Sequence, residues 1–170
     1  MTRTRLPAGT DVAQQEYTAA RIAHWDDVAA SLDTAHHWSG AYHARLTKVF
    51  RSLVPPNQRV LEIGCGQGDL LAAVKPGFGL GVDFSGNMLR RAARRHPHLS
   101  FARADAHALD LSDSQAFDVV ILSDVVNDLW DVEVVFGQLK RVTQRDDLYC
   151  RADLDALCAR GNSRGQGQWR

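Results

Sequence analysis

The sequence lacks the features that identify several classes of protein. Its three cysteines, Cys65, Cys150 and Cys158, are an odd number without the paired spacing of a zinc site, which argues against a disulfide framework and against structural zinc. Basic and acidic residues number 20 each, so the formal net charge is zero and favours neither nucleic acid nor an anionic membrane. No apolar run approaches transmembrane length. A soluble protein in a reducing, cytoplasmic setting is therefore expected.

Three further features carry little functional signal. The segment Met1–Thr10 has no apolar core after its arginines, so we do not expect a signal peptide. The seven histidines lack helical ligand spacing and partner cysteines, so no metal site is predicted. Four arginines within residues 90–95 form a basic cluster. At zero net charge such a cluster indicates a solvated helix face, with an anion or RNA site as the alternative.

A chain of 170 residues is enough for one domain with a hydrophobic core, and its pattern divides it into four segments. Residues 1–14 are predicted to form a flexible arm. Residues 15–57 carry two helical stripes of apolar residues and end at two prolines, which stop a helix. Residues 58–150 hold an alternating core. Residues 151–170, rich in glycine, arginine and glutamine, are predicted to be a disordered tail with little apolar surface to bury.

Within the core, apolar β-favouring runs alternate with helical patterns. Ser85 is the predicted N-cap of a helix over Gly86–Arg95, and Val119–Leu122 is a continuous apolar run suited to a strand covered on both faces. This alternation predicts an α/β fold with a doubly wound, mainly parallel sheet, preceded by N-terminal helices. We expect strands at 59–63, 80–83, 99–103 and 117–123, and helices at 69–74, 86–95 and 131–142.

The most informative stretch is Val60–Leu71, where an apolar run containing Glu62 leads into three glycines, Gly64, Gly66 and Gly68. This pattern predicts a strand, a tight turn and a helix start, the place where an α/β sheet offers backbone amides to a ligand. A dinucleotide-binding fingerprint is spaced G-x-G-x-x-G, whereas this turn is spaced G-x-G-x-G. A purely structural turn with a solvent-capped glutamate is the alternative, because glycine-rich turns are common.

Acids also follow the next two predicted strands. Asp83 ends the second strand about twenty residues after the glycines begin, where Rossmann-type sheets place an acid on the ribose hydroxyls. A carboxylate suits this position because it accepts both hydrogen bonds of a vicinal diol. Asp105 follows the third strand. Capping of the next helix would explain Asp83 alone, but three acids at successive strand ends predict a ligand site along that edge of the sheet.

The glycine turn with Glu62, and the string Gly81–Leu89 around Asp83, resemble the first two motifs of the Rossmann-like methyltransferases that depend on S-adenosylmethionine (SAM). The resemblance implies that the turn lies under the methionine part of SAM, that Glu62 orients the amino-acid end, and that Asp83 binds the ribose. It further implies that Asp105 accepts a hydrogen bond from the adenine amino group. The cofactor contacts it implies are Glu62, Gly64, Cys65, Gly66, Gly68, Asp83, Phe84, Met88, Asp105, Ala106 and Ser123.

Some of these residues have plainer interpretations. Cys65 is a small side chain that fills the turn, and Met88 suits the core side of its predicted helix. Trp38 and Tyr42 precede the sheet, where many family members fold a helix over the cofactor. Lining the pocket and packing in the core both remain open for these two aromatic residues.

The resemblance places Ser123–Trp130 beside the sulfonium and the reacting methyl group. Methyl transfer is an in-line displacement that needs alignment more than covalent help. Asp124 is therefore expected to supply a complementary charge or to position the nucleophile, with Asn127 or Asp128 facing the substrate. Capping of the helix that begins near Asp131 is the alternative for Asn127 and Asp128. The predicted catalytic residues are Asp124 and Asn127.

The same segment limits the substrate. It lacks the Asp/Asn-Pro-Pro-aromatic motif of enzymes that methylate base amino groups, and Cys65 has no preceding proline as in enzymes that methylate base C5. Nucleic-acid methylation is therefore not expected, and a small-molecule acceptor is. The segment is also similar to bacterial methyltransferase domains linked to glycosyltransferases, which suggests a sugar-related acceptor.

The resemblance runs from about Trp25 to Val142 and stops there. The family's fold continues to a fifth parallel strand and an antiparallel pair, whereas this sequence offers one short candidate strand, Leu148–Cys150. We interpret the chain as truncated at its C-terminal strands, with a frameshift near Thr143–Asp147 as the hypothesis. The fourth strand would then lie at or next to a sheet edge, where self-association with another chain is favoured.

Three functions follow from these observations. The first is an active SAM-dependent methyltransferase. The second is a truncated, non-catalytic module that binds SAM. The third is a nicotinamide-dependent oxidoreductase, which the spacing of the glycine turn disfavours.

Overall fold

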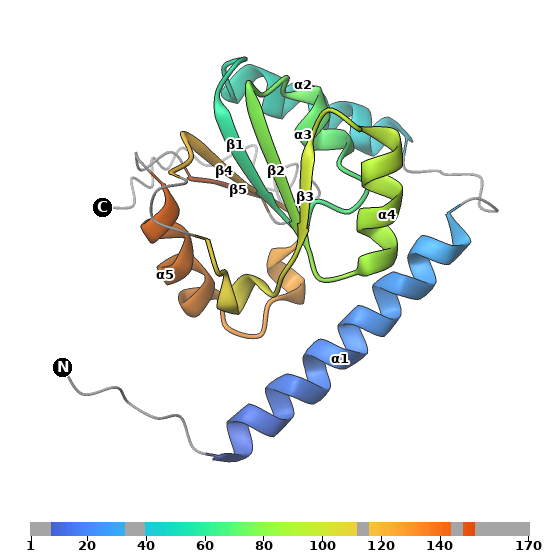
Figure 1. Cartoon of the computed structure of the whole chain (residues 1–170), viewed down its shortest axis with the longest axis vertical. Coiled ribbons are helices and arrows are strands. Elements are labelled where there is room, and N and C mark those ends of the chain that lie inside the picture. The colour runs from blue at the N-terminus through green and yellow to red at the C-terminus, as the bar shows by residue number, and fades with distance from the viewer. Residues whose placement is uncertain (1–7, 33–39, 112–115, 144–147, 152–170) are drawn as a thin grey trace, which may run out of the picture.

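The computed structural model describes residues 8–32, 40–111, 116–143 and 148–151 (Figure 1). Five strands form one sheet in the order β3-β2-β1-β4-β5, and every neighbouring pair is parallel. The predicted α/β fold with a doubly wound parallel sheet is confirmed. The strands are β1 Arg59–Ile63, β2 Phe78–Asp83, β3 Ser100–Arg103, β4 Val119–Ser123 and β5 Leu148–Arg151.

The helices fall where the apolar periodicity predicts them, except at the N-terminus. The first helix begins at Ala8, so residues 8–14 are helical where an arm was expected. The helices are α1 Ala8–Ser31, α2 Gly40–Leu53, α3 Asp69–Ala73, α4 Gly86–Arg95 and α5 Val132–Val142, with the short 3₁₀ helices η1 Ala106–Ala108 and η3 Val126–Asp128.

Local capping explains where the two core helices start. Ser85 has extended backbone angles and its hydroxyl accepts a hydrogen bond from the Met88 amide, so it is the N-cap of α4 as predicted. Asp131 does the same for α5, where its carboxylate accepts from the Val134 amide at 3.0 Å. Each cap satisfies an amide that the first turn of a helix leaves without a backbone partner.

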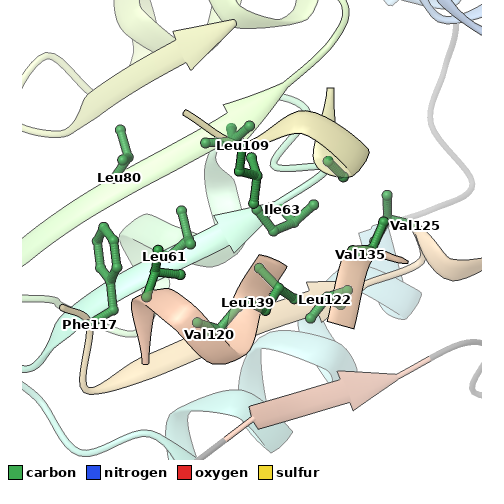
Figure 2. Packing of buried hydrophobic residues seen from close by; sticks show 13 residues of the cluster. Leu61, Ile63, Leu80, Leu109, Phe117, Val120, Leu122, Val125, Val135 and Leu139 are labelled. Atoms are coloured by element: carbon green, nitrogen blue, oxygen red, sulfur yellow. The ribbon is translucent and has the colours of Figure 1, made fainter. Parts of the chain in front are cut away.

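Apolar clusters cover both faces of the sheet. One cluster joins Leu61 and Val120 of the sheet to Val135 and Leu139 of α5 (Figure 2). The other joins Val60 and Ile121 to α2 and α3, which contribute Leu46, Phe50 and Leu71. Neighbouring residues of β1 and β4 therefore point into opposite clusters, which is why both strands are continuous apolar runs. Helix α4 packs against β2 and β3, and α1 runs alongside α4 (Figure 1).

The strand order places a switch point between β1 and β4. The chain builds β2 and β3 outward on one side of β1 and then returns to β4 on the other side. In this pair Ile63 is level with Leu122, so the loops that follow both strands start side by side. Open α/β sheets bind ligands in the crevice that such a reversal leaves.

Strand β5 is the last described element at the C-terminal end. Strand β5 contains the predicted short strand 148–150 and pairs with β4, so β4 lies next to the last described strand. The proposed break near 143–147 and the predicted disordered tail after 151 fall mainly outside the described residues. Self-association through a sheet edge stays a prediction.

Candidate cofactor and active site

A pocket opens at the carboxyl ends of β1, β2 and β3, on the side of the switch point. Its walls come from the glycine turn, from Asp83 at the end of β2, from Asp105 after β3, and from η3. Helix α1 contributes Thr18 and Arg21 to the same pocket. Of the residues predicted as cofactor contacts, those that line the pocket are Gly64, Asp83, Phe84, Asp105 and Ala106.

The glycine turn requires glycine for two different reasons. Gly64, Gly66 and Gly68 all have left-handed backbone angles, with φ of 70°, 51° and 75°. A Cβ on Gly64 would lie 2.6 Å from the Cγ2 of Val125, so the turn touches the loop after β4. A Cβ on Gly66 would meet no atom within 4 Å. Gly64 is therefore fixed by packing, and Gly66 by its backbone conformation alone.

This difference predicts different stability losses for two alanine variants. Gly64→Ala combines a left-handed backbone with a clash, and we expect it to lower the free energy of unfolding by about 3 kcal/mol. Gly66→Ala carries the backbone strain alone and should lose about 1 kcal/mol. Urea unfolding of both variants beside the unaltered chain measures the difference. Equal losses would show that the contact with Val125 does not fix the turn.

Four amides of the glycine turn donate to acceptors within the fold, whereas the sequence predicted a turn that offers its amides to a ligand. Those of Gly64 and Cys65 donate to the Val82 carbonyl at 2.8 and 3.1 Å. The Gly66 amide donates to Asp83 Oδ2 at 2.9 Å, and the Gly68 amide donates to the Cys65 carbonyl at 2.8 Å. The turn therefore satisfies these four donors internally, so they do not contribute to an amide cradle for a phosphate.

Asp83 organises the turn from the end of β2. Its side chain is buried, and Oδ1 accepts the Ser85 amide at 2.8 Å while Oδ2 accepts the Gly66 amide. Burial raises the pKa of Asp83, and its backbone hydrogen bonds oppose that shift. Each oxygen keeps a second lone pair, and the residue lines the pocket, so Asp83 can also accept hydrogen bonds from a ligand.

Glu62 lies buried behind the turn with unfilled hydrogen-bonding capacity. It is 3% exposed, and its Oε2 has no hydrogen-bond partner among the described residues. Burial raises the pKa of Glu62 to about 8; the Leu71 amide opposes the rise, and the negative charges of Asp83, Asp69 and Asp124 add to it. A cationic group of a ligand would relieve this buried site, because an opposite charge favours the ionised carboxylate.

Asp105 lies at the end of β3 as the N-cap of η1. Its Oδ1 accepts the His107 amide at 2.9 Å and lies 2.6 Å from His107 Nδ1. The other ring nitrogen of His107 accepts the Asp131 amide at 3.0 Å. Asp105, Ala106 and His107 all line the pocket. The sequence identified Asp105 and Ala106 but gave no specific signal for His107.

Asp124 is an exposed carboxylate in a strained position after β4. Its φ of 57° is left-handed, which is uncommon for a residue with a side chain. The hydroxyl of Tyr42 on α2 donates to Asp124 Oδ1 at 2.5 Å. Neighbouring Ser123 is buried, and its Oγ has no hydrogen-bond partner in the part of the chain that the structure describes. Asn127 is exposed on η3.

Asp128 anchors α1, which neither interpretation of the sequence anticipated. Its carboxylate lies 2.5 Å from the Arg21 guanidinium and accepts the indole N–H of Trp25 at 2.8 Å. The cap of α5 is Asp131 instead, so capping by Asp128 is wrong. A second anchor lies further along α1, where Asp26 accepts the Ser85 hydroxyl at 2.5 Å.

Removing the Asp128 carboxylate should loosen α1. Asp128→Ala leaves the Arg21 charge and the Trp25 indole without their partner, and we expect a loss of about 2 kcal/mol in the free energy of unfolding. Hydrogen exchange of the α1 amides should rise more than exchange in the sheet. Asp110→Ala, at an exposed aspartate, is the matched control and should stay within about 0.5 kcal/mol of the unaltered chain. Equal exchange in α1 for both variants would contradict the anchor.

Cys65 and Met88 have structural surroundings. The Cys65 thiol is buried, and a Cβ on Gly81 would lie 2.7 Å from its sulfur, so the side chain fills the space over β2. Burial also raises the pKa of this thiol, which makes it a poor nucleophile. Met88 is buried on α4. Neither residue is among those lining the pocket, so a side-chain contact of either with a cofactor stays a prediction.

Comparison with known proteins identifies the family. A family model described as a methyltransferase domain matches residues 60–146, which include the glycine turn and all three strand-end acids. The chain belongs to this family of methyltransferase domains. The family predicted from the sequence is thereby confirmed.

The chain matches about half of the length of two curated relatives. The chain is 31% identical over 125 residues to a demethylmenaquinone methyltransferase of Streptomyces griseus, covering 71% of this chain and 54% of the relative. It is 30% identical over 133 residues to that of Renibacterium salmoninarum, covering 72% and 53%. The chain thus spans about half the length of these relatives.

Solved structures agree on the fold. Phosphoethanolamine N-methyltransferase 1 of Haemonchus contortus, solved with phosphoethanolamine and S-adenosylhomocysteine, superposes with a TM-score of 0.68 at 19% identity, covering 82% of this chain and 33% of that one. The N-methyltransferase NodS of Bradyrhizobium japonicum gives 0.60 at 19% identity, covering 72% and 74%. Within the described residues, no helix is both long and apolar enough to cross a membrane.

Proposed function

We propose that this methyltransferase domain binds SAM at the carboxyl ends of β1, β2 and β3 and transfers its methyl group to a small molecule held beside β4. The observation that carries the proposal is the chemistry of the glycine turn. Four of its amides are satisfied internally, and the negative charges of Asp69, Asp83 and Asp124 act on the buried Glu62 behind it. Such a site suits a cationic nucleoside and opposes a pyrophosphate, which disfavours the nicotinamide alternative.

The residues present fit SAM. Glu62 has a buried oxygen without a partner, which suits the ammonium of the amino-acid end. Asp83 lines the pocket and suits the ribose hydroxyls, and Asp105, which lines it beside Ala106, suits the adenine amino group. When bound, SAM supplies an electrophilic methyl group on a positively charged sulfur. The protein then has to hold the acceptor in line and exclude water.

The acceptor side is assigned to the end of β4. The Asp124 carboxylate is exposed, and the Tyr42 hydroxyl donates to one of its oxygens. Asp124 can take up a proton from an acceptor N–H or O–H as general base, while the Tyr42 hydroxyl holds one of its oxygens. Asn127, exposed on η3, is proposed to contact the same substrate. This deepens the predicted role of Asp124 and adds Tyr42 to it.

The identity of the acceptor is a narrower proposal. The curated relatives are named for demethylmenaquinone, and a structural neighbour is named for phosphoethanolamine. The sequence itself suggested a sugar-related acceptor. We favour a small molecule that carries a proton on the group to be methylated, because Asp124 can accept that proton.

Transfer of labelled methyl groups tests the proposal. The full chain is incubated with methyl-labelled SAM and, separately, a naphthoquinol, phosphoethanolamine and a nucleotide sugar, and the labelled product is counted. Transfer to one of them that Asp124→Asn lowers by about 100-fold supports an active enzyme. Binding of SAM without transfer to any of them favours the truncated, non-catalytic module.

A further inference from the structure

We infer that His107 is a positioning residue that fixes the Asp105 carboxylate so that the site selects adenine. This inference rests on the proposed SAM site and assigns a new role within it. His107 follows Asp105 by two residues on η1, and both line the pocket. Its side chain is 9% exposed, so the ring is held inside the protein.

The two ring nitrogens of His107 bridge two parts of the fold. Nδ1 lies 2.6 Å from Asp105 Oδ1, at the end of β3. Nε2 lies 3.0 Å from the backbone nitrogen of Asp131, the N-cap of α5. The imidazole therefore ties the adenine-side acid to the start of a helix that packs in the core under the sheet.

These partners determine which nitrogen carries the proton. The Asp131 backbone N–H can only donate, so Nε2 must accept and carries no hydrogen. In a neutral ring the hydrogen is then on Nδ1, which donates it to Asp105 Oδ1. The His107 backbone amide donates to the same oxygen. Two donors thus converge on Oδ1 and leave Oδ2 as the oxygen for a ligand.

A carboxylate oxygen in a fixed position discriminates between purines. Adenine presents an amino group that donates to it, whereas hypoxanthine presents a carbonyl oxygen at the same place, which the carboxylate repels. A site built to pair with a donor rejects an analogue that lacks it far more strongly than an apolar pocket does. If Asp105 were free to rotate, much of that discrimination would be lost.

Two conservative variants separate the two contacts of the ring. In His107→Asn the side-chain amide nitrogen reaches the place of Nδ1, so a donor to Asp105 is kept and the acceptor for Asp131 is lost. In His107→Gln the side-chain oxygen reaches the place of Nε2, so the acceptor for Asp131 is kept and the donor to Asp105 is lost. Each variant loses one hydrogen bond, and we expect similar falls in thermal midpoint.

The measurement is the ratio of dissociation constants for S-inosylhomocysteine and S-adenosylhomocysteine, by calorimetry on the full chain. The unaltered chain should prefer the adenosyl compound. His107→Gln should reduce that preference roughly tenfold, and His107→Asn should keep it within about twofold. Asp105→Asn, whose amide can donate, should shift the preference toward the inosyl compound.

The outcomes that overturn the inference are separate from those that overturn the proposed function. An unaltered ratio in His107→Gln, or equal losses of preference in both histidine variants, would show that His107 serves only the fold. Binding of S-adenosylhomocysteine without discrimination would remove the role of Asp105. If the unaltered chain binds neither compound, the proposed SAM site and this inference fall together.

Discussion

Replacing Asp83 with alanine is expected to weaken the binding of S-adenosylhomocysteine by at least about 100-fold, because in the proposed site this carboxylate accepts two charge-assisted hydrogen bonds from the ribose hydroxyls. The variant also leaves the amides of Gly66 and Ser85 without their acceptor, so the glycine turn loses its shape. Calorimetric titration of the folded variant measures the affinity.

Asp118→Ala is the matched control for this experiment. Asp118 also accepts a strand-end amide, that of Arg59 at 2.8 Å, but in an exposed hydrogen bond at the amino ends of β1 and β4, away from the site. Both variants should lose stability, Asp118→Ala by about 1 kcal/mol and Asp83→Ala by about 2 kcal/mol or more, because Asp83 accepts two amides. Only Asp83→Ala should lose affinity. If Asp83→Ala binds S-adenosylhomocysteine as tightly as the control does, the assignment of the ribose site is wrong.

Replacing Glu62 with glutamine is expected to stabilise the protein without ligand while weakening its binding of ligand. The folded-state pKa of Glu62 is about 8, against an ordinary value of 4.5. Below pH 4.5 the carboxyl is protonated in both the folded and the unfolded state, so its raised pKa does not lower the free energy of unfolding. As the pH rises from 4.5 to 8, the unfolded state ionises first and the free energy of unfolding falls. At 1.36 kcal/mol per pKa unit, and after subtracting the cost of burying the glutamine amide, Glu62→Gln should have a free energy of unfolding roughly 2–4 kcal/mol higher than the unaltered chain at pH 8.

Thermal unfolding of both proteins from pH 4.5 to pH 8 measures this effect. The midpoints should agree at the acid end and diverge in favour of Glu62→Gln as pH rises. The binding heat of S-adenosylhomocysteine should depend on the ionisation heat of the buffer near pH 7, because the ligand's ammonium drives Glu62 to release its proton. A Glu62→Gln variant that is less stable at pH 8 would show that Glu62 is ordinary structural support.

Local patterns in the sequence predicted most of the fold. Ser85 and the helix that it caps were predicted from adjacent residues. Asp83 and Asp105 were predicted to share a site because the carboxyl ends of parallel strands meet at one edge, and both line the pocket. The contacts that complete the site are not local. Trp25 meets Asp128 across 103 residues, and Tyr42 meets Asp124 across 82. Such pairs depend on where α1 and α2 pack, which apolar periodicity does not specify.

For the glycine turn, the sequence predicted the backbone conformation but not the hydrogen-bond partners of its amides. Its spacing predicted the turn and its backbone conformation, and the family that follows from it is confirmed. Its amides were expected to face a ligand, yet Val82, Asp83 and Cys65 accept them. Three of these four amides donate to Val82 and Asp83, so whether they are free depends on acceptors that β2 supplies. His107 was missed for the same reason, because its partner at Asp131 is 24 residues away.

The most direct test of the account is calorimetric titration of the full chain with S-adenosylhomocysteine and, separately, with NAD. The buried acids around a turn in which four amides are already satisfied predict saturable binding of one S-adenosylhomocysteine per chain and no binding of NAD. Binding of NAD without S-adenosylhomocysteine, or of neither compound, would contradict the account.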